Sequence, residues 1–168
     1  YEQVSSGRTD HIESVSVRYD PEQVSYSELL DIFWRQIDPT DDGGQFADRG
    51  SHYKTAIFYS SEEQKLAAEK SKKELESSGI FNRPIVTAVL PAQPFFAAEE
   101  YHQDYYRKNV MHYSAYKKGS GREAFIETVW AEKEIGAGGF VKPDDEELKK
   151  TLSSMQYNVT QRDDTEPP

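Results

Sequence analysis

The chain of 168 residues contains no cysteine, which excludes disulfides and cysteine-ligated metal sites within it. Its four histidines show no paired ligand spacing, so we expect neither a metal site nor a bound cofactor. No apolar run approaches the roughly 20 residues of a membrane span. Basic residues are outnumbered 30 to 20 by acidic ones, and the net charge of −10 argues against a nucleic-acid or anionic-membrane surface. The compartment, cytoplasm or cell envelope, stays open.

Enough apolar material is present for one domain, with 36% hydrophobic and 12% aromatic residues. Strands are predicted to alternate with helices, which favours an α/β fold with helices packed on a sheet. A capping box of Ser25 and Glu28 predicts the start of the first helix. The predicted elements are a strand ending at residue 19, a helix at 25–38, a strand at 53–59, a helix at 61–79, a strand covered on both faces at 85–90, a helix at 97–109 and a short apolar segment at 124–130.

Glu13 stands where a buried strand face is expected to carry an apolar residue. Val15, Val17 and Tyr19 alternate with polar residues, and the same parity puts Glu13 on their face. A carboxylate there meets a positive partner or takes up a proton, because desolvation disfavours its charged form. A carboxylic acid that stays protonated near neutral pH can act as a general acid. Alternatively, the strand begins one residue later and Glu13 lies in a solvated loop.

Two other segments differ in composition from the rest. Residues 39–52 form a loop rich in Asp and Gly that is long enough to suggest function. Beyond residue 130 the next residues are mostly small or charged, with Gly-Ala-Gly-Gly at 136–139, which is typical of a linker. Residues 140–168 cannot bury a core alone, so we expect a docked or extended tail, or the start of a further domain.

Four segments together resemble peptide methionine sulfoxide reductase A. They are residues 9–13 (Thr-Asp-His-Ile-Glu), 44–50 (Gly-Gln-Phe-Ala-Asp-Arg-Gly), 53–58 (Tyr-Lys-Thr-Ala-Ile-Phe) and 98–105 (Ala-Glu-Glu-Tyr-His-Gln-Asp-Tyr). The resemblance covers residues 1–130 and implies a mixed sheet with a ferredoxin-like core. Residues 142–148 and 156–161 separately resemble the opening of methionine sulfoxide reductase B. We therefore expect an N-terminally truncated A-like domain at 1–130, a linker at 131–141 and the start of a B-like domain at 142–168, as in bacterial A/B fusion enzymes.

The resemblance implies a peptide-methionine (S)-S-oxide reductase, an oxidoreductase acting on a sulfur group with a disulfide as acceptor. Such enzymes repair oxidised proteins and also act on free methionine sulfoxide, and thioredoxin is the expected reductant. A cysteine thiolate attacks the sulfoxide sulfur, and a second thiol reduces the resulting sulfenic acid. The family's nucleophile lies in a Gly-Cys-Phe-Trp motif that this chain lacks, and Ser114 and Ala115 occupy the region of its recycling cysteines. We therefore expect the chain to be inactive in isolation.

The resemblance also assigns roles to residues of this chain. Glu13 would protonate the sulfoxide oxygen, Tyr1 and Tyr53 would bind that oxygen, and Asp48 would order the site and hold substrate. The family histidine at the position of His102 is expected to support the site from behind the residues that touch substrate, or to be structural. In residues 44–50, Phe46-Ala47 departs from the more widespread Gln-Gly form of the loop.

Each role has an ordinary alternative. Tyr1 could be only a chain terminus, Tyr53 a core aromatic that begins a strand, and Asp48 a turn residue. Two other functions also remain. The chain could be a non-catalytic module that binds oxidised methionine, or an α/β module that binds a protein partner, with Glu13 in a salt bridge.

Overall fold

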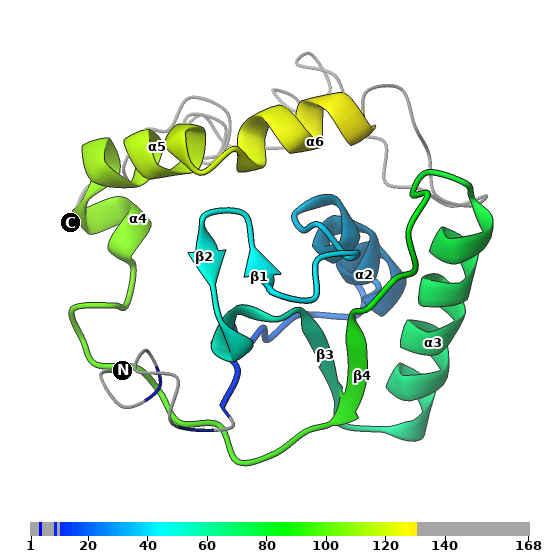
Figure 1. The fold of residues 1–168 in the computed structure, drawn as a ribbon. Coiled ribbons are helices and arrows are strands. Elements are labelled where there is room, and N and C mark those ends of the chain that lie inside the picture. Colours follow the sequence, from blue (N-terminus) through cyan, green and yellow to red (C-terminus); the bar gives the residue numbers. More distant parts are fainter. Residues whose placement is uncertain (1–3, 5–8, 10, 131–168) are drawn as a thin grey trace, which may run out of the picture.

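The computed structural model describes residues 4, 9 and 11–130, and its elements are labelled in Figure 1. Helix α2 spans Tyr26–Arg35, and the predicted capping box is present: the Glu28 N–H donates to the Ser25 hydroxyl (3.2 Å) and the Ser25 N–H to the Glu28 carboxylate (2.7 Å). Leu30 and Trp34 point from this helix into the core. The predicted start of this helix is therefore confirmed, whereas its end lies at Arg35 and not at the predicted residue 38.

Strand β3 (Ala56–Tyr59), helix α3 (Glu62–Ser77) and strand β4 (Ala88–Pro91) form a β-α-β unit. The two strands are parallel, with Ala56 opposite Ala88. Helix α3 begins at the Ser61 cap and ends before Gly79, whose φ of +71° is the left-handed conformation that closes helices. The Trp34 indole N–H donates to the Ser71 hydroxyl (3.1 Å), which ties α2 to α3.

One core lies between α2, α3 and the β3–β4 strands. Trp34 is almost completely buried in it, with only 1% of the residue exposed. The buried hydrophobic residues are Leu30, Trp34, Ile37, Ile57, Ala68, Leu75, Ile85 and Trp130. Trp130 brings helix α6 (Arg122–Trp130) to this core, with the Arg35 guanidinium 5.1 Å from its ring centroid.

The segment that carries the candidate site is built from short elements. Strands β1 (Gly44–Gln45) and β2 (Asp48–Arg49) form a small antiparallel hairpin, and the 3₁₀ turn η1 (Ser51–Tyr53) follows it. Helices α4 (Tyr105–Lys108), α5 (Val110–Gly119) and α6 come later in the chain. In Figure 1, α5 and α6 lie across the hairpin, on the side away from β3 and β4.

Several sequence predictions need correction. Residues 11–20 form no strand with any described residue, and Val15 and Val17 are 87% and 61% exposed rather than buried beside Glu13. A strand forms only where a neighbour completes its hydrogen bonds, and periodicity cannot supply that neighbour. The strand predicted at 53–59 starts only at Ala56, and the one predicted at 85–90 is Ala88–Pro91 and partly exposed. The expected sheet is present as two separate strand pairs.

The helix predicted at 97–109 is also wrong over most of its length. Residues 97–104 are not helical, and Asp104 has φ +53° in the left-handed region, which a continuous right-handed helix cannot pass through. Only α4 forms there, and α5 follows it without having been predicted. The linker and B-like domain expected at 131–141 and 142–168 lie outside the described residues, as does Tyr1. Within the described part, no helix has the length and apolarity to cross a bilayer.

Candidate functional site

Glu13 reaches the hairpin region through its backbone and its side chain. Its N–H donates to the His52 carbonyl oxygen (2.9 Å), which joins residues 11–20 to η1. Its carboxyl group accepts a hydrogen bond from the Tyr53 side chain. The residue as a whole is exposed, but the carboxyl end faces the protein, and burial raises its pKa above the ordinary value of 4.5.

Neighbouring charges act on the same carboxyl group in opposite directions. The charge of Asp48 raises the pKa of Glu13, whereas the charges of His52 and His102 and the hydrogen bond from Tyr53 lower it. The net shift is upward, with burial as the largest cause. Glu13 therefore keeps its proton to a higher pH than an ordinary glutamate, although not because it shares a face with the valines.

Tyr53 is positioned by the turn that ends η1. Its N–H donates to the Gly50 carbonyl oxygen (3.1 Å), and its ring lies 4.1 Å from the His52 ring, measured between centroids. Tyr53 is half-buried, so its hydroxyl can meet both the protein and an entering molecule. A phenol is a neutral donor at working pH.

Asp48 lies in β2, where it pairs with Gln45 of β1. Its Oδ2 accepts a hydrogen bond from the Tyr116 hydroxyl of α5, a residue 68 positions later in the chain. Gly44 makes the tight hairpin possible: its φ is +147°, and a Cβ there would lie 2.2 Å from the Asp48 carbonyl oxygen. The backbone at Asp48 can therefore approach β1 this closely only because residue 44 is a glycine.

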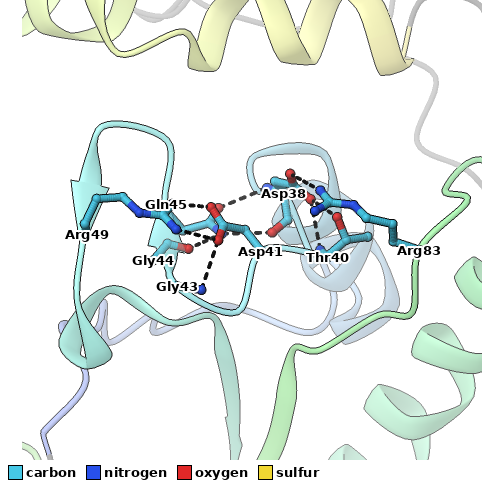
Figure 2. A network of polar contacts seen from close by, with 8 residues as sticks. All are labelled: Asp38, Thr40, Asp41, Gly43, Gly44, Gln45, Arg49 and Arg83. Carbon is cyan, nitrogen blue, oxygen red and sulfur yellow. Dashed lines mark hydrogen bonds and ion pairs between the residues drawn. The ribbon is translucent and has the colours of Figure 1, made fainter.

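A polar network holds the loop that leads into this hairpin, as Figure 2 shows. Arg49 forms a two-point ion pair with Asp41, in which Nη2 lies 3.0 Å from Oδ1. That bond lowers the pKa of Asp41. Gln45 is buried and bonds Asp38 in both directions, accepting from its N–H (2.9 Å) and donating to its carbonyl (2.8 Å). The loop of residues 39–52 is therefore internally braced.

Two further Asp38 contacts complete the network in Figure 2. The Thr40 hydroxyl donates to the Asp38 carboxylate (2.6 Å). Arg83, which follows helix α3 in the sequence, donates to the same carboxylate (3.2 Å). These contacts fix the loop that leads into the hairpin.

The structure therefore brings together four of the residues that the sequence singled out: Glu13, Asp48, Tyr53 and His102. His102 is half-buried near enough for its charge to act on Glu13. Tyr1 is outside the described residues. In the described part of the chain, no group of three acidic, histidine or cysteine side chains is placed to hold a metal ion.

Sequence reasoning missed two residues of this cluster. His52 is buried next to Tyr53, and its position between the segments 44–50 and 53–58 could have marked it as a candidate site residue. Tyr116 carried no local signal, because α5 has no buried residue and hence no apolar stripe to mark it. Chemically, a carboxylic acid with a raised pKa beside a phenol offers two donors to one strongly accepting oxygen, and one of them can also give up its proton.

Comparison with known proteins gives consistent matches. The family model described as "Peptide methionine sulfoxide reductase" matches residues 1–134. Peptide methionine sulfoxide reductase MsrA of Bacillus pumilus is 53% identical over 133 residues, covering 79% of this chain and 75% of that protein. Peptide methionine sulfoxide reductase MsrA/MsrB of Vibrio cholerae is 42% identical over 185 residues, covering the whole of this chain and 49% of that protein.

Solved structures agree with the sequence relatives. Mxr1 from Saccharomyces cerevisiae in reduced form superposes with a TM-score of 0.62 at 35% identity, covering 66% of this chain and 60% of that one. Methionine sulfoxide reductase A of Corynebacterium diphtheriae gives 0.56 at 33% identity, covering 66% and 57%. The chain spans about half the length of the Vibrio protein and less than two thirds of either solved chain.

Proposed function

Because the chain belongs to the peptide methionine sulfoxide reductase family, we propose that it supplies the proton-donating and oxygen-binding residues of an enzyme that reduces methionine S-sulfoxide. The substrates are oxidised methionines in proteins and peptides, and free methionine sulfoxide. The observation that carries the proposal is the Glu13 carboxyl group, which has a raised pKa, accepts a hydrogen bond from Tyr53 and lies beside Asp48.

In the proposed reaction a cysteine thiolate attacks the sulfoxide sulfur while Glu13 protonates the oxygen. The sulfur–oxygen bond breaks and the oxygen moves to the cysteine sulfur, so that thiolate, sulfoxide and one proton become sulfenic acid and sulfide. A second thiol then releases water and forms a disulfide, which thioredoxin reopens. Since this chain has no cysteine, both thiols come from outside its 168 residues.

Tyr53 and Asp48 have separate tasks in this scheme. When substrate is bound, the single O–H of Tyr53 turns from Glu13 to the sulfoxide oxygen and keeps that oxygen next to Glu13, and Tyr1 is proposed as the second phenol on it. Asp48 holds the site in order and raises the proton affinity of Glu13 through its charge. His102 acts on Glu13 from a distance and touches no substrate.

We also propose that the chain comes from an A/B fusion, with an A-like domain at 1–130, a linker at 131–141 and the start of a B-like domain at 142–168. The full-length match to the Vibrio cholerae fusion protein supports this arrangement. We likewise propose, from the resemblance, that the A-like domain has a ferredoxin-like core.

The test is turnover by the full-length gene product with each purified epimer of N-acetyl-methionine sulfoxide and a dithiol reductant. Reduction of the S epimer is expected, and chromatography of the product measures it. Because the A and B enzymes each act on one epimer, reduction of the R epimer reports the proposed B domain separately. A full-length product that contains cysteine but leaves the S epimer untouched would refute the proposal. A product without any cysteine would favour the non-catalytic binding module.

A further inference from the structure

We propose that Tyr116 is a positioning residue of the candidate site, whose hydroxyl group orients the Asp48 carboxylate beside Glu13. The hydroxyl donates to Asp48 Oδ2, and this bond links helix α5 to strand β2 across 68 residues of sequence. Its role in catalysis rests on the proposed function, whereas the positioning itself does not.

The helix that carries Tyr116 is anchored to the same hairpin by its successor, α6. The Phe125 ring meets the Phe46 ring at the hairpin turn, with centroids 5.4 Å apart, and the Arg122 guanidinium lies 4.9 Å from the Phe46 centroid. Phe46 has φ +53°, an uncommon conformation for a bulky residue that persists where the surroundings hold it. The turn and the carboxylate are therefore fixed from one side by α6 and α5 (Figure 1).

Tyr116 is placed to act through its hydroxyl group more than through packing. The residue is 40% exposed and α5 buries none of its side chains, so the ring contributes little to the core. Replacing it with phenylalanine removes the O–H group and leaves the ring. An effect of that change on Asp48 or Glu13 would thus report the hydrogen bond.

The charges around the pair give the expected sign. Burial, followed by the hydrogen bond to Asp48 and its charge, raises the pKa of Tyr116 to about 12, so the phenol stays a donor at neutral pH; Arg122 opposes this shift and Glu13 adds to it. A bond donated to a carboxylate stabilises its charged form. Loss of the donor therefore leaves the Asp48 charge less compensated, and because that charge already raises the pKa of Glu13, the proton affinity of Glu13 is expected to rise further; His52, His102 and Tyr53 act on Glu13 in the opposite direction.

The experiment is a pH titration of the 168-residue chain by ¹³C NMR of the Glu13 carboxyl carbon. Tyr116→Phe is expected to move the Glu13 midpoint upward by about 0.5–1 pH unit, with the melting temperature unchanged. Tyr113→Phe is the matched control, since Tyr113 is 43% exposed on the same helix and its ring centroid lies 6.2 Å from that of Tyr106. In an Asp48→Asn background, Tyr116→Phe should leave the Glu13 midpoint where it is.

A reciprocal measurement keeps the inference open to refutation. Asp48→Asn should lower the pKa of Tyr116 from about 12, as read from the ring carbon that bears the hydroxyl group. An unchanged Glu13 midpoint in Tyr116→Phe, or an equal shift in Tyr113→Phe, would overturn the positioning role. Neither readout needs turnover, so this inference and the proposed reductase activity can fail independently.

Discussion

Replacing Glu13 by glutamine separates its proton from its hydrogen-bonding capacity. Glutamine can still donate to a sulfoxide oxygen, but it cannot transfer a proton, so only the acid step is removed. General acid catalysis of this kind contributes about 10²–10⁴-fold. We therefore expect Glu13→Gln to slow reduction of the S epimer by about that factor in the full-length gene product.

The pH dependence follows from the direction of the pKa shift. Burial and the charge of Asp48 raise the pKa of Glu13 above 4.5, so the acid form persists to a higher pH and wild-type activity falls as that proton is lost. The Gln variant should lose this alkaline limb. Single-turnover kinetics across pH 5–9 measure both effects, and Glu76→Gln on the exposed side of α3 serves as the control.

Stability gives an independent check with its own sign. A carboxyl group whose folded-state pKa is raised favours folding at low pH, and this contribution is lost as the pH rises through the folded-state pKa. The difference in unfolding free energy between Glu13→Gln and wild type should thus favour the variant more at pH 8 than at pH 4. The change between the two pH values should be less than about 1 kcal/mol, because the residue is exposed. Urea unfolding at the two pH values measures the difference.

In the kinetic assay, a Glu13→Gln variant that reduces the S epimer at the wild-type rate with an unchanged pH profile would refute the acid role.

Three smaller predictions test neighbouring features. Tyr53→Phe should lose about 1–3 kcal/mol of transition-state stabilisation, seen as lower kcat/KM with the alkaline limb of Glu13 retained; a lost limb would contradict the division of roles. Ser25→Ala should cost about 1 kcal/mol of unfolding free energy in urea, because it removes the cap of α2, and an unchanged midpoint would show that the cap contributes nothing. Gly44→Ala should cost about 1–3 kcal/mol, because the new Cβ collides with the Asp48 carbonyl oxygen, and wild-type stability there would contradict the hairpin geometry.

Sequence alone determined the features whose causes lie within a few residues. The Ser25–Glu28 box begins α2, Ser61 caps α3 and Gly79 closes it, because each signal is a contact between positions three or four apart or a single backbone conformation. Sequence also carried the family resemblance, which directed attention to Glu13, and it showed that the 168 residues contain no cysteine. None of these needed a tertiary contact.

Tertiary structure decided what depends on partners far apart in the chain. The valines after Glu13 alternate as a strand should, yet no described neighbour pairs with them and they are exposed. The raised pKa of Glu13 arises from burial and from the charge of Asp48, against the opposing charges of His52 and His102, and Tyr116 reaches Asp48 across 68 residues. Periodicity and capping report only local free energies. Pairing, desolvation and proton affinity depend on which distant groups the folded chain brings together, and so the cause of the raised pKa of Glu13 became visible only in three dimensions.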